Sequence, residues 1–182
     1  MFTFNQNDCS SSPEYAIQRD ETYLPAGDAV NLSSECEIYE KHIRAAGGID
    51  LQILGLGVNG HIGFNEPGSS LGSRTRIKTL TRETLDANSR FFNADEFQPD
   101  CALTMGIGTI LEAKKIVMLA TGVSKAKAVQ RAVEGPVMAR CPATVLQMHP
   151  QVTLILDHAS ASQLEDKEYY LHSESIQQQI VA

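Results

Sequence analysis

Short apolar runs alternate with amphipathic segments along this chain, and glycine or proline separates most of them. The apolar runs predict strands at 51–54, 76–80, 102–105, 116–120 and 152–156. Periodic apolar positions predict helices at 36–46, 82–92 and 124–133 and a short helix at 142–148. Alternation of strands with helices indicates an α/β fold built on a parallel sheet.

The helix expected at 36–46 has a recognisable signal at each end. Ser34 and Glu37 fit a capping box, in which both side chains accept hydrogen bonds from free backbone N–H groups. Gly47 and Gly48 end the helix. Residues 1–20 are polar and irregular and are expected to form a lead-in segment, which leaves 21–182 as a single α/β domain.

Composition narrows the classes of function. The chain has 182 residues, of which 42% are hydrophobic, and a net charge of −7, which argues against nucleic acid or an anionic membrane as the main partner. No apolar segment approaches the roughly eighteen residues of a membrane span. The start of the chain lacks the features of a signal peptide. The scattered cysteines Cys9, Cys36, Cys101 and Cys141 predict neither a zinc site nor disulfides, so a reducing cytoplasm is expected.

Residues 55–60, GLGVNG, match the Gly-x-Gly-x-x-Gly pattern of dinucleotide-binding loops. Such a loop needs a long helix to begin at the turn and an acidic residue about twenty positions later. Pro67 interrupts any helix here, and the later region holds Arg74, Arg76 and Lys78. A nicotinamide cofactor is therefore disfavoured.

The residues that follow this turn combine acid–base groups. Asn59, His61 and Glu66 come just after the carboxyl end of an expected strand, where open α/β sheets bind ligands. A carboxylate beside a histidine can fix the imidazole tautomer, as general acid–base catalysis requires. A tight loop whose polar side chains only satisfy backbone groups fits the same spacing.

The stretch 54–81, LGLGVNGHIGFNEPGSSLGSRTRIKTLT, resembles the signature segment of glucosamine-6-phosphate deaminases. ANSRFF at 87–92, ALTMG at 102–106 and GVSKA at 122–126 resemble this family too. The sister 6-phosphogluconolactonases share the Gly-x-Gly-x-x-Gly-His core but not the Asn-Glu-Pro-Gly continuation. The resemblance implies a three-layer Rossmann-like α/β fold. It also implies conversion of glucosamine 6-phosphate and water to fructose 6-phosphate and ammonia, with neither cofactor nor metal.

The resemblance assigns roles to the acid–base residues. His61 would open the pyranose ring of the amino-sugar phosphate, aided by Glu66 and Asn59. Some members of the family carry aspartate at the position of Asn59. Because an amide bears no charge, tuning of His61 would then depend on Glu66.

Positive groups are needed for the substrate phosphate in a chain of negative net charge. Lys125 lies in the first turn of the helix expected at 124–133, where free N–H groups favour an anion. Arg90 can bind phosphate oxygens through two N–H groups at once. Both residues match phosphate-contacting positions of the family, and Gly57 and Gly60 let the backbone approach the ligand closely.

Ser69, Arg76 and Lys78 match a second set of family positions. In some hexameric members these positions bind N-acetylglucosamine 6-phosphate as an activator, so a regulated homo-oligomer is one admissible state. Arg74, Arg76 and Lys78 alternate as strand residues do and are expected on one face. Plain solvent-facing charges would show the same alternation.

Family members begin with a further α/β half. It carries a Thr-Gly-Gly-Thr-Pro phosphate loop and an Asp-Glu-Tyr segment whose aspartate removes the C2 proton of the open-chain sugar. Neither motif occurs in this sequence, so the fold is expected to be N-terminally incomplete. Three functions stay open: an active deaminase, a non-catalytic sugar-phosphate-binding chain, and a 6-phosphogluconolactonase-like hydrolase.

Overall fold

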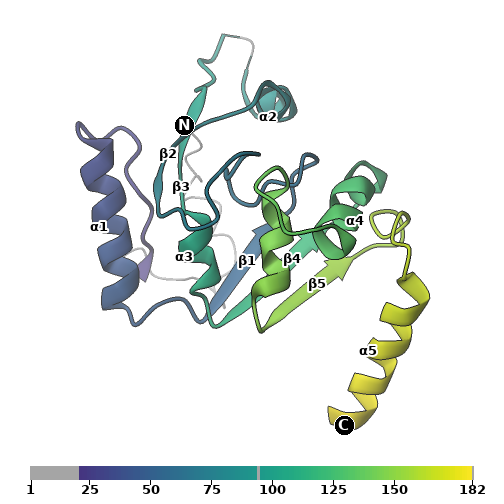
Figure 1. Ribbon diagram of the computed structural model, residues 1–182. Coiled ribbons are helices and arrows are strands. Elements are labelled where there is room, and N and C mark those ends of the chain that lie inside the picture. The colour runs from purple at the N-terminus through teal and green to yellow at the C-terminus, as the bar shows by residue number, and fades with distance from the viewer. Residues whose placement is uncertain (1–20, 94, 182) are drawn as a thin grey trace, which may run out of the picture.

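A parallel sheet in the order β1-β4-β5 forms the centre of the computed structural model, which describes residues 21–93 and 95–181 (Figure 1). The lead-in expected at 1–20 lies outside the described residues. The strands are β1 Leu51–Gly55, β2 Arg76–Thr79, β3 Cys101–Thr104, β4 Lys115–Ala120 and β5 Val152–Leu156. The α-helices are α1 Leu32–Ala45, α2 Arg82–Asn88, α3 Ile107–Leu111, α4 Ala126–Glu134 and α5 Lys167–Val181. Turns of 3-10 helix are η3 Ser89–Phe91, η4 Val123–Lys125 and η5 Pro142–Met148.

Strand pairing confirms the expected α/β class with a mostly parallel sheet. In the central sheet, Leu51 of β1 lies opposite Lys115 of β4, and Ile116 of β4 lies opposite Val152 of β5. Strands β2 and β3 form a separate antiparallel pair, in which Arg76 lies opposite Thr104. The carboxyl ends of β1, β4 and β5 therefore meet at one edge, where ligands bind in sheets of this type.

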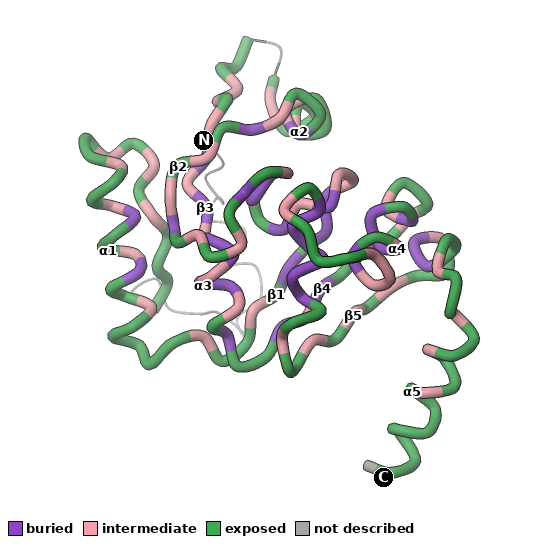
Figure 2. Tube along the Cα trace, viewed as in Figure 1, coloured by how far each residue is buried: buried purple, intermediate pink, exposed green. Residues whose placement is uncertain are grey.

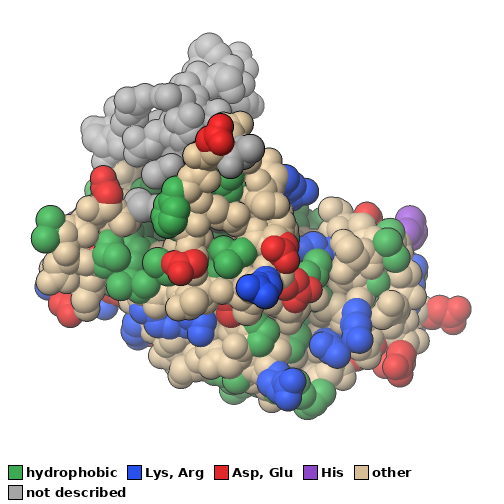
Figure 3. All heavy atoms as spheres, turned by 90° about the horizontal axis from the view of Figure 1, so that it is seen from above, with side chains coloured by type: hydrophobic (Ala, Val, Ile, Leu, Met, Phe, Trp, Pro, Cys, Tyr) green, Lys and Arg blue, Asp and Glu red, His purple; other side chains and the backbone are tan. Residues whose placement is uncertain are grey.

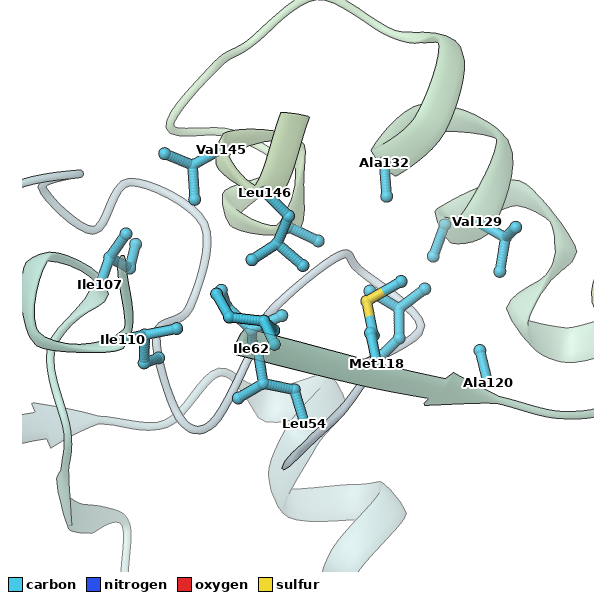
Figure 4. Close-up of a cluster of buried hydrophobic side chains, with 14 of the residues drawn as sticks. Leu54, Ile62, Ile107, Ile110, Met118, Ala120, Val129, Ala132, Val145 and Leu146 are labelled. Carbon is cyan, nitrogen blue, oxygen red and sulfur yellow. The ribbon is translucent and has the colours of Figure 1, made fainter. Parts of the chain in front are cut away.

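The hydrophobic core covers one face of the central sheet. Leu54 and Met118 point from β1 and β4 toward Leu146 of η5 and Val129 of α4 (Figure 4). Ile62, from the loop after β1, is fully buried among them. The loop that follows β1 is thus anchored in the core by an apolar side chain.

The other face of the sheet remains exposed. Its side chains alternate with the core positions, and Leu51, Ile53, Leu119 and Ile155 are between 42% and 62% exposed (Figure 2). Parallel sheets are normally covered on both faces. Within the described residues, helices cover only the core face, and α5 extends away from the sheet (Figure 1).

Helix α1 corrects the expected capping box. The helix begins at Leu32, and Asn31 is its N-cap, with its Oδ1 accepting a hydrogen bond from the Ser34 N–H at 3.0 Å. Glu35, rather than Glu37, accepts a bond from a preceding backbone N–H, that of Ala26. Asparagine and serine are both favourable N-caps, and here the earlier one starts the helix.

Two further helices differ from the expected ranges at their ends. Helix α2 stops at Asn88, and the last turn expected there is the 3-10 turn η3. The helix expected at 124–133 starts as the 3-10 turn η4 and becomes α-helical at Ala126. Terminal turns tighten in this way because their backbone groups lack full α-helical partners.

Gly106, the N-cap of α3, lies where the backbone leaves no room for a side chain. A methyl group on Gly106 would overlap the backbone of Ser73 and Arg74, neither of which can move without displacing the start of β2. We expect Gly106→Ala to lower the free energy of unfolding in urea by about 3 kcal/mol. Gly72→Ala is the matched control, because a methyl group there meets open space. Equal urea midpoints of unfolding for Gly106→Ala and Gly72→Ala would contradict this packing argument.

Candidate active site at the carboxyl end of the sheet

The loop after β1 forms a tight turn under the imidazole of His61. The N–H of Gly57 donates to the carbonyl of His61 at 2.9 Å, and the N–H of Gly60 donates to the carbonyl of Gly57 at 3.0 Å. Gly60 has a positive φ of 87°. A methyl group on Gly57 would overlap the imidazole ring, so glycine is needed there to make room for His61.

Asn59 sets the orientation of that imidazole. Its Nδ2 donates to Oε2 of Glu66 at 2.9 Å, and a carboxylate can only accept. Its Oδ1 therefore faces His61, where it accepts from the backbone N–H at 3.1 Å and lies 2.9 Å from Nδ1. Nδ1 carries the proton in this arrangement, which leaves the lone pair of Nε2 free to accept a proton from a substrate.

Glu66 is a buried negative charge beside the imidazole. Only 1% of the residue is exposed, and its Oε2 lies 3.5 Å from Nδ1 of His61. Burial raises the pKa of Glu66, but hydrogen bonds from the side chains of His61, Thr84 and Asn59 outweigh it and lower the pKa to about 2. The carboxylate is therefore ionised near neutral pH, where it stabilises a positive charge on His61.

The two expected phosphate ligands come from different elements, and the charge of one acts on the other. Arg90 is exposed in η3, and Lys125 is half-buried at the end of η4, where α4 begins. Burial and then the charge of Arg90 lower the pKa of Lys125, while Glu83 opposes them. A phosphate bound by both cations would relieve their mutual repulsion.

Asp157 is a site-supporting residue that sequence reasoning did not find. Its carboxylate accepts from the N–H of Gly122 at 2.9 Å and from the N–H of Ser160 at 2.7 Å. Gly122, with φ at 86°, turns the chain from β4 into η4 and so toward Lys125. The aspartate followed three residues later by serine was the available signal, since such pairs form local turns.

The residues expected to bind an activator differ in their surroundings. Ser69 is 2% exposed, and its hydroxyl has no hydrogen-bond partner among the described residues. Arg76 is half-buried, and its Nη1 donates to Oδ1 of Asn65 at 2.9 Å. Lys78 is half-buried on the same face of β2. Arg76 and Lys78 thus share one strand face, and the structure gives no contact between them and Ser69 among the described residues.

Arg74, Arg76 and Lys78 were expected on one strand face, and the structure corrects this expectation for Arg74. Arg74 precedes β2 and forms an ion pair with Glu112, and its Nη1 lies 3.9 Å from Oε2 of Glu40. Glu40 also accepts a hydrogen bond from the hydroxyl of Thr75 at 2.6 Å. Arg74 thus belongs to a structural link between α1, α3 and the start of β2.

Two further findings concern metal ions and membrane spans in the part of the chain that the structure describes. No group of three or more His, Cys, Asp or Glu side chains is arranged to hold a metal ion there. None of the helices described is long and apolar enough to cross a membrane. Seen from above the carboxyl edge, acidic and basic side chains are interspersed over the visible face (Figure 3).

Comparison with known proteins adds sequence similarity to this geometry. Residues 11–155 match the family described as glucosamine-6-phosphate isomerases/6-phosphogluconolactonase. The chain is 57% identical to a glucosamine-6-phosphate deaminase from Cellvibrio japonicus over 91% of this chain and 63% of that relative. It is 54% identical to a deaminase from Shewanella woodyi, with the same two coverages. The chain therefore spans less than two thirds of the length of these curated relatives.

Solved structures of the same two enzyme types are also similar to this chain over part of their length. A monomeric glucosamine-6-phosphate deaminase matches with a TM-score of 0.78 and 44% identity, over 80% of this chain and 61% of that one. The 6-phosphogluconolactonase from Trypanosoma cruzi matches with a TM-score of 0.56 and 22% identity, over 72% of this chain and 52% of that one. The second likeness concerns the fold alone.

Proposed function

Because the chain belongs to the family of glucosamine-6-phosphate isomerases and 6-phosphogluconolactonases, we propose that its site serves the conversion of glucosamine 6-phosphate and water to fructose 6-phosphate and ammonia. The observation that carries the proposal is the linked set of Glu66, Asn59 and His61, which leaves Nε2 of His61 free. Arg90 and Lys125 supply positive charge for the phosphate of the same substrate. The reaction belongs in the cytoplasm, where sugar phosphates are found.

Ring opening is the step that these residues carry. Nε2 of His61 takes the proton of the anomeric hydroxyl, the C1–O5 bond breaks as the C1 carbonyl forms, and the proton passes to O5. The imidazolium that exists between the two transfers is stabilised by the buried carboxylate of Glu66 at 3.5 Å from Nδ1. One imidazole acts as base and then as acid, so the residue ends the step unchanged.

Neither strand-end aspartate is a candidate for the base that removes the C2 proton. Asp50 forms an ion pair with Lys114 at 2.6 Å, and Asp157 is occupied by the N–H groups of Gly122 and Ser160. This observation favours a second candidate function, a non-catalytic chain that binds sugar phosphates. A lactonase-like hydrolase has less support, because the curated relatives at 54–57% identity are deaminases.

Ammonia release by the purified chain tests the proposal. The chain is incubated with glucosamine 6-phosphate, and binding of the sugar phosphate is followed in parallel by titration calorimetry. Turnover that His61→Ala abolishes would support the deaminase function. Binding without turnover would support the non-catalytic binder, and neither binding nor turnover would overturn both.

Charge reversal tests the phosphate residues. We expect Lys125→Glu or Arg90→Glu to raise the dissociation constant for glucosamine 6-phosphate by about ten- to a hundredfold, the effect of losing one charge-assisted hydrogen bond. Thermal unfolding should change little, because neither residue is part of the core. Lys127→Glu is the matched control, since Lys127 is exposed on the adjoining helix α4. An unchanged constant would remove the altered residue from the phosphate site.

A further inference from the structure

Asn65 is a fully buried amide between two site residues, and the ring-opening step does not use it. Its Nδ2 donates to the carbonyl of Ile62 at 2.9 Å and to the carbonyl of Met105 at 2.8 Å. Its Oδ1 accepts from Nη1 of Arg76 at 2.9 Å. Both amide hydrogens and the amide oxygen are therefore bonded, each to a different group.

These bonds join three segments of the chain. Ile62 belongs to the same loop, Met105 follows β3, and Arg76 begins β2. The backbone N–H of Asn65 also donates to the carbonyl of Ile62, at 3.1 Å. The N–H of Phe64 donates to the hydroxyl of Thr104 at 3.1 Å. The loop is thus closed on itself and fastened to the β2–β3 pair.

The closure acts on the two residues that flank it. His61 precedes Ile62, and Glu66 follows Asn65, so the bond from Asn65 to Ile62 turns the chain back on itself between them. The turn brings Oε2 of Glu66 to 3.5 Å from Nδ1 of His61 and within hydrogen-bond distance of Asn59. A loop released from this closure would leave Glu66 free to move away from both.

We propose that Asn65 is a positioning residue that holds Glu66 against Asn59 and thereby keeps His61 in its Nδ1-protonated tautomer. An amide fits this place, because its Nδ2 donates to the carbonyls of Ile62 and Met105 while its Oδ1 accepts from Arg76. Aspartate has the same shape but offers two acceptors, and a carboxylate oxygen facing two carbonyls is repelled. The importance of this role for catalysis rests on the proposed function. The positioning of Glu66 and His61 by Asn65 does not depend on it.

The tautomer of His61 in Asn65→Asp tests this role directly. Nitrogen-15 NMR of labelled histidine reports the ratio of the Nδ1-protonated to the Nε2-protonated form, and His61→Gln identifies the signal of His61. We expect Asn65→Asp to lower that ratio by about three- to tenfold, as loss of one net hydrogen bond would. Asn31→Asp makes the same chemical change at the N-cap of α1, where Oδ1 only accepts, and should leave the ratio unchanged.

The possible outcomes distinguish a role of Asn65 in positioning His61 from a role in packing alone. An Asn65→Asp chain that melts earlier but keeps the His61 tautomer would overturn the proposal. If that variant does not fold, Arg76→Met removes one of the three side-chain bonds and should shift the ratio in the same direction by less; no shift would overturn it. A shifted ratio in a chain that fails to bind glucosamine 6-phosphate would support the positioning role and count against the proposed function alone.

Discussion

Replacing His61 with glutamine is expected to reduce the acceleration of ring opening in glucosamine 6-phosphate by about 10²- to 10⁴-fold, the usual contribution of a general acid–base group. Glutamine fills similar space and can hydrogen-bond to Asn59, so the loop should keep its conformation. The measurement is the rate of exchange between the α and β anomers of the sugar phosphate, followed by NMR magnetisation transfer. Anomer exchange needs ring opening and not removal of the C2 proton, so it reports on the ring-opening step separately from isomerisation.

His172→Gln is the control for this variant. His172 is exposed on α5, which extends away from the sheet (Figure 1), and its replacement should leave anomer exchange unchanged. A His61→Gln chain that exchanges the anomers as fast as the unchanged chain would show that another group moves the proton.

Acid is expected to remove about 3 kcal/mol of stability through Glu66 alone. Its pKa in the folded chain is about 2, below the ordinary value of 4.5. A lowered folded pKa contributes stability that is fully present above the unfolded value and is lost as the pH falls toward the folded value. The loss therefore occurs as the pH falls from 4.5 to about 2, and each pKa unit corresponds to about 1.4 kcal/mol.

Urea unfolding of the unchanged chain and of Glu66→Gln at several pH values isolates this contribution. Other carboxylates with lowered pKa values, such as Glu40 and Asp157, also contribute stability that is lost in acid. Their contributions are the same in both chains. The difference in unfolding free energy between the two chains should therefore shrink as the pH falls. A difference independent of pH would contradict the lowered pKa. Glu66→Gln should also slow ring opening, because a positive charge on His61 would lose the carboxylate 3.5 Å from its Nδ1, and an unchanged rate would exclude this role of Glu66.

Local sequence patterns predicted the central strands because those strands are short, apolar and bounded by turn residues. The expected ranges 116–120 and 152–156 agree with β4 and β5 within one residue. Helices α3 and α5 were not predicted. Helix α3 has only five residues, too few for a helical period, and the last turns of α5 are dominated by glutamine. The antiparallel pairing of β2 with β3 joins residues distant in sequence, which no local pattern encodes.

The candidate site divides in the same way. The position of His61 and Glu66 after a strand followed from their spacing, and the structure brings both together with Asn59. Burial and bonding partners did not follow from spacing. From the sequence, Asn65 could have been a plain loop residue. Arg74 and Arg76 have the spacing of residues on one strand face, and only the structure shows that Arg74 precedes the strand and pairs with Glu112. These roles depend on contacts between segments that only the folded chain brings together.

The burial of Ile62 has a consequence for the dynamics of the site. Because this side chain lies among Leu54, Met118 and Leu146 (Figure 4), the loop that carries His61 cannot detach without opening the core. The amide hydrogen of Gly57, bonded to the carbonyl of His61, should therefore exchange with solvent only at a free energy near that of global unfolding. Amides in α5, exposed along most of its length, should exchange far sooner (Figure 2). His61 is thus placed when the chain folds, so under the proposed function no binding energy from the sugar phosphate would be spent on ordering it.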